Sequence, residues 1–197
     1  MNWTKRIILF ELSYWDKLLL RHNIDVMYVE KNLCDNLLGI VLDITGKTKD
    51  TDKARLELED MSIRRELHLI ESNGRCSKPP AAYVLSRTDI RTFCRFLKSV
   101  RFLDGFASNL SRNIVEEQGK LYGLKSHDCH ILLQRLLPIG ICPFLTKQIR
   151  DTLVELAQFF QKLTARTLEV QDLNALEEGG VLLLCKSERI FPPAFSQ

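Results

Sequence analysis

Apolar side chains recur at close to helical spacing over most of the chain, and the first such segment runs from Asn23 to Leu42. Its apolar positions repeat about every 3.6 residues, at Ile24, Met27, Tyr28, Leu33, Leu37, Leu38 and Val41. Gly46 lies just beyond the segment, where glycine commonly stops a helix. We therefore predict one helix here, with Asn23 or Asp25 as its N-cap and with Glu30 facing solvent.

Two polar stretches interrupt the helical pattern. Residues 47–60 are dominated by charge and read KTKDTDKARLELED, which predicts a solvated connector that turns helical near its end. Residues 71–80 read ESNGRCSKPP and contain Asn-Gly and Pro-Pro, two strong breakers of regular structure. This second stretch is the predicted boundary between two structural units, and the second unit is expected to begin near Ala81.

The second unit opens with a helix start signal. Ser86 is followed three residues later by Asp89, a spacing that lets a hydroxyl and a carboxylate cap the first free amides. We predict a helix over about residues 87–101, and its expected buried face consists of Ile90, Phe93, Cys94, Leu97 and Val100. The opposite side of this helix carries a basic stripe of Arg87, Arg91, Arg95 and Lys98.

Three more helices are expected before the end of the chain. Ser126 is the expected N-cap of a helix that runs to Leu137 and is ended by Pro138. Residues 146–168 form a long amphipathic pattern, and Asp172 is expected to cap a final helix to about residue 190. The predicted fold class is mainly α: a helical array with a few short strands or extended segments.

Composition is that of an ordinary globular protein. The chain has 197 residues, of which 45% are hydrophobic and 27% are charged, and its formal net charge is only +3. Neither a secretory signal nor a membrane span is expected, so we predict no membrane partner and a location in the nucleus or cytoplasm. Six cysteines are scattered without a Cys-x-x-Cys pair, which favours reduced, mostly buried thiols.

Two short motifs invite a ligand interpretation. Gly46-Lys47-Thr48 resembles the end of a phosphate-binding loop, but that motif needs a glycine where this chain has Val41. His127 and His130 lie three residues apart with Asp128 between them, so they could share a metal ion. A structural zinc site needs about four ligands, and since no second cluster is visible, capping and packing roles are favoured and no metal is predicted.

Basic charge is concentrated in one part of the chain. Residues 87–135 contain nine basic and five acidic residues, so this block carries a net charge of +4. A basic helix face could lie along DNA phosphates, and the candidate DNA-binding residues are Arg87, Arg91, Arg95, Lys98, Arg101, Arg112 and Lys125. The alternative is a solvated helix face, which is the commoner explanation of such a stripe.

The sequence contains no complete set of catalytic residues. Asp25 and Glu30 are five residues apart, which does not place them on one helix face as a carboxylate pair. The chain contains no Gly-x-Ser-x-Gly motif, and no serine or cysteine has an evident base.

Several runs of the chain nevertheless match one family. They are Leu19–Met27, Glu30–Asp35, Gly46–Asp50, Gly123–His130 with Leu132–Pro138, and Glu188–Phe195. In these runs the chain resembles the plant CACTA (En/Spm-type) transposases. The resemblance covers nearly the whole chain. It implies that residues 1–46 are a remnant of the catalytic domain, whose last helix belongs to an RNase H-like fold. It further implies that residues 47–80 are a connector and breaker-rich loop and that residues 81–197 are a helical domain of unknown function.

The resemblance also carries expectations about chemistry. Such transposases use acidic residues to hold divalent metal ions such as Mg²⁺, which activate water and a DNA 3′ hydroxyl. Glu30 and its neighbour Asp25 are the positions that correspond to acidic ligands, although Tyr28 stands where the family usually has histidine. His127, Asp128 and His130 belong to a family motif of unknown role. Because the upstream acidic residues are missing and both ends look truncated, the resemblance implies an inactive polypeptide.

These observations lead to three hypotheses. The first is a transposase-derived module that retains DNA binding, or that associates with itself or with a full-length transposase. The second is a relic without function, and the third is a metal-dependent DNA recombinase or nuclease that would depend on Glu30. The sequence favours the first two hypotheses over the third, with binding as the expected activity of the first, and the nuclear location follows from the resemblance alone.

Overall fold

The computed structural model describes residues 11–14, 17, 25–72, 74–102, 110–192 and 195. It is mainly helical, which confirms the predicted fold class. The helices are α1 (Val26–Val41), α2 (Asp52–Asp60), α3 (Arg87–Ser99), α4 (Ser126–Ile131), α5 (Leu137–Gly140), α6 (Lys147–Leu163) and α7 (Val170–Ile190). A π-helical turn, Leu132–Leu136, joins α4 to α5. Among the described residues, no helix is long and apolar enough to cross a membrane.

Among the described residues, the strands form two antiparallel hairpins. The first pairs β1 (Ile70–Ser72) with β2 (Arg75–Ser77). It lies in the stretch predicted to interrupt regular structure. Gly74 takes a positive φ of 72° at its turn, a conformation that glycine adopts without strain. The second hairpin pairs β3 (Ile114–Val115) with β4 (Lys120–Leu121), and its turn includes Gly119.

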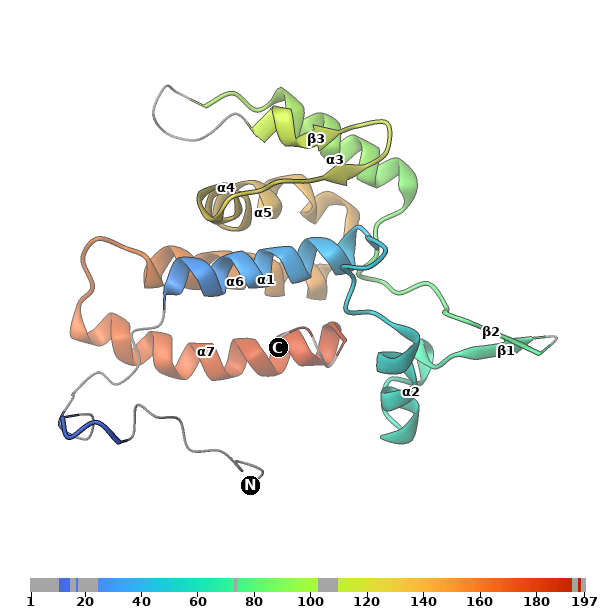
Figure 1. The fold of residues 1–197 in the computed structure, drawn as a ribbon, viewed down its shortest axis with the longest axis horizontal. Coiled ribbons are helices and arrows are strands. Elements are labelled where there is room, and N and C mark those ends of the chain that lie inside the picture. Colours follow the sequence, from blue (N-terminus) through green and yellow to red (C-terminus); the bar gives the residue numbers. More distant parts are fainter. Residues whose placement is uncertain are drawn as a thin grey trace.

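The helices stack in layers (Figure 1). The first layer holds α3 and the β3–β4 hairpin, the second α4 and α5, the third α1 and α6, and the last α7, while α2 and the β1–β2 hairpin project to one side. One hydrophobic core runs through the layers from Cys34 to Phe195. Residues on both sides of the predicted boundary at 47–80 therefore share a single core.

Helix α1 begins where its sequence allows the best cap. The Asp25 carboxylate accepts hydrogen bonds from the amides of Met27 (3.0 Å) and Tyr28 (3.2 Å), so Asp25 is the N-cap. Asn23, the other predicted cap, lies outside the described residues. The prediction that Glu30 faces solvent is wrong, because its side chain is fully buried. Glu30 lies on the side of α1 that packs against α4, where partners distant in sequence supply its hydrogen bonds.

Helix α3 follows the sequence prediction closely. The Ser86 hydroxyl accepts a hydrogen bond from the Asp89 amide at 3.2 Å. Phe93, Cys94 and Leu97 are buried, and the helix ends at Ser99. Burial raises the pKa of the Cys94 thiol to about 11, as expected of an unreactive core cysteine. Four of the six cysteines are buried, as the sequence pattern predicts, and all six are free thiols in this structure.

Two details of the α4–α5 segment differ from the prediction. Lys125 is the N-cap residue of α4 rather than Ser126, and the Lys125 amide donates to the Asp128 carboxylate at 2.9 Å. Pro138 does not end the helix but lies within α5. A proline cannot donate to the carbonyl four residues earlier, here that of Gln134. The Gln161 side chain donates to this carbonyl instead, at 2.6 Å, and the π turn accommodates the ring.

The last two helices are shorter or capped differently than expected. Helix α6 follows Thr146 as predicted but ends at Leu163. Helix α7 begins after Glu169, so Asp172 is not the N-cap. The Asp172 carboxylate instead accepts from the Glu169 amide at 3.4 Å, as the third residue of a capping box does.

The predicted solvated connector contains a buried ion pair. Asp50 and Arg55 are 2% and 1% exposed, and Arg55 donates to Asp50 through two nitrogens at 2.5 and 2.7 Å, which offsets the cost of burying the two charges. The Tyr83 hydroxyl also donates to Asp50, at 3.0 Å. Burial alone would raise the pKa of Asp50, but hydrogen bonds from Arg55 and its positive charge hold that pKa below its ordinary value. This network anchors α2 to the body of the fold.

Candidate functional site

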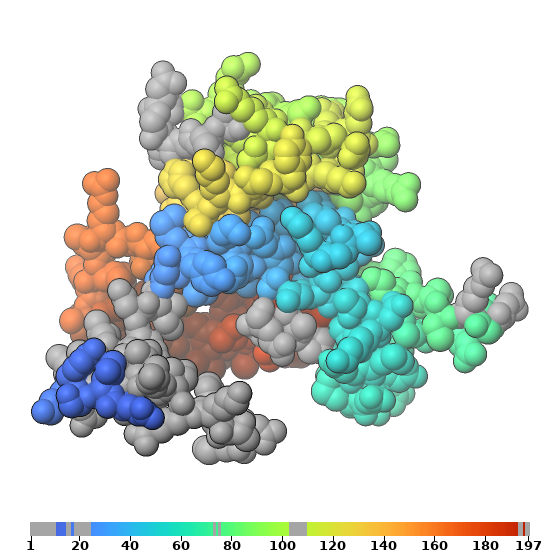
Figure 2. All heavy atoms as spheres, viewed as in Figure 1, coloured from blue at the N-terminus to red at the C-terminus, as the bar shows by residue number. Residues whose placement is uncertain are grey.

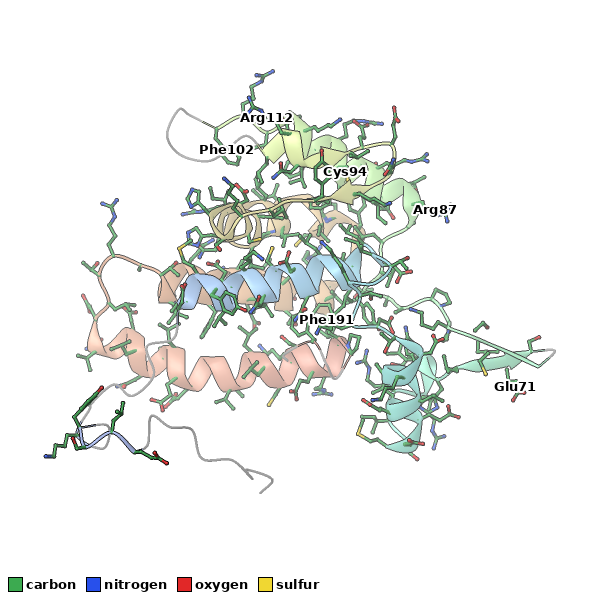
Figure 3. The ribbon with its side chains drawn as sticks, viewed as in Figure 1. Glu71, Arg87, Cys94, Phe102, Arg112 and Phe191 are labelled. Atoms are coloured by element: carbon green, nitrogen blue, oxygen red, sulfur yellow. The ribbon has the colours of Figure 1, made fainter. Side chains whose placement is uncertain are left out.

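The basic stripe predicted on α3 lies on the exposed side of that helix. Arg87, Arg91, Arg95 and Lys98 are spaced by four, four and three residues, which places them on one face opposite Phe93 and Leu97. All four side chains are exposed. Figure 3 shows Arg87 pointing outward at one end of α3, and Arg112 projecting from the same outer layer of the molecule. The stripe therefore forms a basic edge on the outermost layer.

Acidic neighbours modify part of this edge. The Arg95 guanidinium forms an ion pair with Glu116 at 3.0 Å, and Arg91 and Lys98 line a hollow of about 690 Å³ beside Glu116 and Glu117. Glu116 follows β3 and offsets the charge of Arg95. In the described part of the chain, no ion pair involves Arg87, Arg91 or Lys98, so these three cations remain available to an external anion.

The other predicted DNA-binding residues are more dispersed. Arg101, Arg112 and Lys125 are all exposed. Arg101 follows the end of α3, Arg112 lies in the 3₁₀ turn Leu110–Asn113, and Lys125 precedes α4. Arg112 also supplies a backbone carbonyl that accepts a hydrogen bond from the Tyr122 hydroxyl at 3.0 Å.

Two further basic residues join this region without having been predicted. Lys47, in the loop after α1, and Lys120, in β4, line a groove together with Arg87 and Arg91. The groove has a volume of about 910 Å³. Lys120 belongs to the basic block recognised in the sequence, but Lys47 is forty residues away from Arg87 along the chain and no local pattern links them. Only the packing of α3 and the β3–β4 hairpin beside the end of α1 brings them together.

The two candidate catalytic carboxylates do not meet. Asp25 is exposed at the start of α1 and accepts two backbone amides, whereas Glu30 is buried further along the same helix. Five residues on an α-helix correspond to a rotation of about 140°, so the two side chains leave α1 in different directions.

Glu30 is the centre of a buried polar cluster at the junction of α1, α4 and the π turn. His130 Nδ1 lies 2.7 Å from Glu30 Oε2, and the Gln134 amide donates to Glu30 Oε1 at 2.9 Å. The Gln134 amide also donates to the Thr164 hydroxyl at 3.0 Å. Both oxygens of Glu30 are thus occupied by side chains of the protein, and the cluster ties α1, α4 and the π turn to the end of α6.

In the His127-Asp128-His130 motif, two side chains hold the structure together and one lies at the surface. Asp128 is buried and holds the start of α4, and His130 holds Glu30. His127 is exposed, and its ring stacks on that of His130 with centroids 6.1 Å apart. Among the described residues, no group of three or more histidine, cysteine or acidic side chains is arranged to hold a metal ion.

The donor set does not fit the Mg²⁺ ion that the resemblance implies. Mg²⁺ requires oxygen ligands in near-octahedral geometry, supplied by carboxylates that converge on one point. Asp25 and Glu30 face different surroundings, and both Glu30 oxygens already accept hydrogen bonds from His130 and Gln134. Asp25 and Glu30 therefore do not form a site for this ion.

Comparison with known proteins finds no matching family, no similar curated protein and no similar solved structure.

Proposed function

We propose that this protein is a transposase-like DNA-binding module that contacts duplex phosphates through the basic face of α3. The observation that carries the proposal is the line of exposed cations formed by Arg87, Arg91 and Lys98, none of them in an ion pair within the described residues. Arg101 and Arg112 extend the positive edge.

The dimensions of this face suit a nucleic-acid backbone. From Arg87 to Lys98 the helix rises about 16 Å, at 1.5 Å per residue. Duplex DNA carries one negative charge per about 1.7 Å of axis, so a helix of this length lies beside several phosphates. Exposed guanidinium groups bind phosphates by two parallel hydrogen bonds. Contacts of this kind fix the position of a protein on DNA without reading its sequence.

Under this proposal the chain binds DNA but does not catalyse strand transfer. A two-metal DNA recombinase needs carboxylates that clamp the ions at one site. The separation of Asp25 from Glu30, and the occupation of Glu30 by His130, support a binding role over a catalytic one. The relation to CACTA transposases and a nuclear location belong to this proposal, and they rest on the sequence resemblance.

Charge reversal on α3 tests the proposal directly. We expect the double variant Arg91→Glu with Lys98→Glu to bind a short DNA duplex at least about tenfold more weakly than the wild type, because two phosphate contacts become repulsive. A matched control reverses Lys53 and Lys162, two exposed lysines on α2 and α6, and therefore has the same net charge. Equal affinities of the two double variants would overturn the assignment to α3.

Self-association is a second candidate function, and it is favoured by the outer side of α7. Val170, Leu173, Val181 and Leu184 are 49% to 75% exposed, and their spacing places them along one side of the helix. Apolar residues aligned in this way commonly mark a contact with another protein surface. We expect sedimentation velocity to detect a dimer that Val181→Lys dissociates, whereas a monomer at all concentrations would remove this candidate.

A further inference from the structure

The groove between the end of α1, the start of α3 and the β3–β4 hairpin combines a basic rim with an apolar floor. Its rim carries four cations, contributed by three segments: Lys47, Arg87, Arg91 and Lys120. In Figure 2 the residues of the hairpin, in yellow and yellow-green, lie next to the light-blue residues at the end of α1. The groove therefore exists only in the folded chain.

The charge of the groove is positive. Among the described residues, none of its four cations forms an ion pair. The acidic side chains that line the groove are Asp43 and Glu117, and Asp43 already faces Lys78 at 3.9 Å. Four cations against two carboxylates favour a ligand with more than one negative charge, as successive phosphates provide.

The floor of the groove is apolar. Leu85, Ile90 and Leu121 line it, and Gly119 allows the hairpin to lie close to α3, because a Cβ at that position would come within 2.5 Å of Ile90 Cγ2. Free phosphate would gain nothing from such a floor. A ligand that joins phosphates to flat apolar rings would use both the rim and the floor.

An exposed aromatic ring completes the groove. Tyr122 is 53% exposed, and its hydroxyl donates to the Arg112 carbonyl, which holds the ring at the edge of the groove. Aromatic rings at the surface are platforms on which unpaired bases stack, at a gain of about 1–3 kcal/mol per base. Paired bases are stacked inside a duplex and present only their edges, so this platform selects a single strand.

We propose that this groove binds an unpaired DNA strand, with phosphates on Lys47, Arg87, Arg91 and Lys120 and a base on Tyr122. This inference rests on the proposed DNA binding and deepens it: the outer face of α3 holds duplex, and the groove holds the single strand that continues from it. Arg87 and Arg91 belong to both surfaces, which makes the path continuous.

Fluorescence anisotropy with three labelled DNAs tests this assignment. They are a blunt duplex, the same duplex with a short single-stranded tail, and the tail alone. We expect the tailed duplex to bind the wild type about tenfold more tightly than the blunt one, the gain of about one stacked base. Lys47→Glu with Lys120→Glu is expected to abolish this gain, and Tyr122→Ala to remove most of it. Tyr122→Phe keeps the ring and is expected to retain it.

Controls separate this inference from the function on which it rests. The Lys53→Glu, Lys162→Glu variant has the same charge as the groove variant and is expected to keep the tail gain, and thermal melts establish that each variant is folded. A blunt duplex that binds without any tail gain would overturn the groove assignment and leave the α3 proposal standing. A tail that binds through Lys47 and Lys120 while the blunt duplex does not bind would overturn the α3 proposal and leave the groove. If a free deoxynucleotide competes as effectively as the single-stranded tail does, the proposal that the groove binds a DNA strand would be overturned.

Discussion

At the scale of single residues, buried polar side chains distinguish this protein from a simple helical array. Glu30, His130 and Gln134 form hydrogen bonds inside the junction of α1 and α4, and Asp50, Arg55 and Tyr83 form another network around α2. A buried polar group is stable only when its hydrogen bonds are made. Each network therefore fixes the position of the segments that contribute to it.

Removing Glu30 is expected to destabilise the fold. In Glu30→Ala the ring of His130 and the amide of Gln134 lose a buried acceptor, at a cost of about 1–3 kcal/mol. Chemical denaturation followed by circular dichroism measures the loss, and Glu59→Ala, an exposed change on α2, is the matched control. A Glu30→Ala variant as stable as this control would show that the cluster contributes nothing to stability.

The lowered pKa of Asp50 predicts that the stability of the fold depends on pH. Its carboxyl pKa is lowered in the folded protein, whereas in the unfolded chain it is about 3.9. The unfolded state therefore takes up a proton first, so the stabilisation is complete above about pH 5 and is lost as pH falls through the folded pKa, below about 4.

Denaturation between pH 6 and pH 3 tests the predicted loss of stability on acidification. We expect Asp50→Asn to be less stable at neutral pH and to lose less stability on acidification than the wild type does. Asp52→Asn changes an exposed neighbour and is expected to follow the wild-type curve. Identical pH slopes in the wild type and Asp50→Asn would exclude a contribution from this ion pair.

At the scale of elements, close backbone approach shapes the α3–α5 contact. A Cβ added at Gly140 in α5 would lie 2.7 Å from Phe96 Cδ1 and 2.8 Å from Phe93 Cε2. These rings belong to α3, the helix that carries the basic face. The glycine thus sets the distance at which α3 packs on the rest of the molecule.

Two glycine substitutions are expected to act in opposite directions. Gly140→Ala overpacks the α3–α5 contact and is expected to cost about 1–3 kcal/mol. Gly179→Ala, in α7, has open space around its Cβ and is expected to stabilise the helix by about 0.5–1 kcal/mol. Thermal melts compare the two variants, and a stabilised Gly140→Ala would contradict the packing described for α3.

Local signals in the sequence predict the elements better than they predict the polar interior. Capping by Asp25 and Ser86 and the buried face of α3 depend on neighbours within a few residues, so the pattern reveals them. The burial of Glu30 depends on His130, one hundred residues away, and that of Arg55 depends on Asp50 and Tyr83 together. Charged residues in a polar run resemble a solvated face until their distant partners are known.

In the candidate site, too, local sequence predicts one part and tertiary packing creates the other. Arg87, Arg91 and Lys98 lie on one helix, and helical spacing alone predicts their shared face. Lys47 and Tyr122 come from two other segments, and only the tertiary packing places them beside that face. The sequence thus predicts a basic edge, whereas the groove beside it follows from the structure.

At the scale of the whole molecule, the basic edge and one row of exposed apolar side chains lie on opposite outer layers. The basic edge belongs to α3 and the row to α7, with α1, α4 and α6 between the two helices (Figure 1). This arrangement leaves α7 accessible to another protein surface while α3 contacts DNA. We expect DNA binding by the α3 face to survive Val181→Lys unchanged, as an anisotropy titration would measure.

DNA binding by α3 is tested most directly by the salt dependence of duplex binding. We expect the affinity of the wild type to fall steeply as salt rises, because each phosphate contact releases counterions. The slope of log K against log salt is expected to become shallower by about two in Arg91→Glu, Lys98→Glu, one for each lost contact. A folded wild-type protein that shows no salt-dependent duplex binding, or a variant with an unchanged slope, would contradict DNA binding by α3.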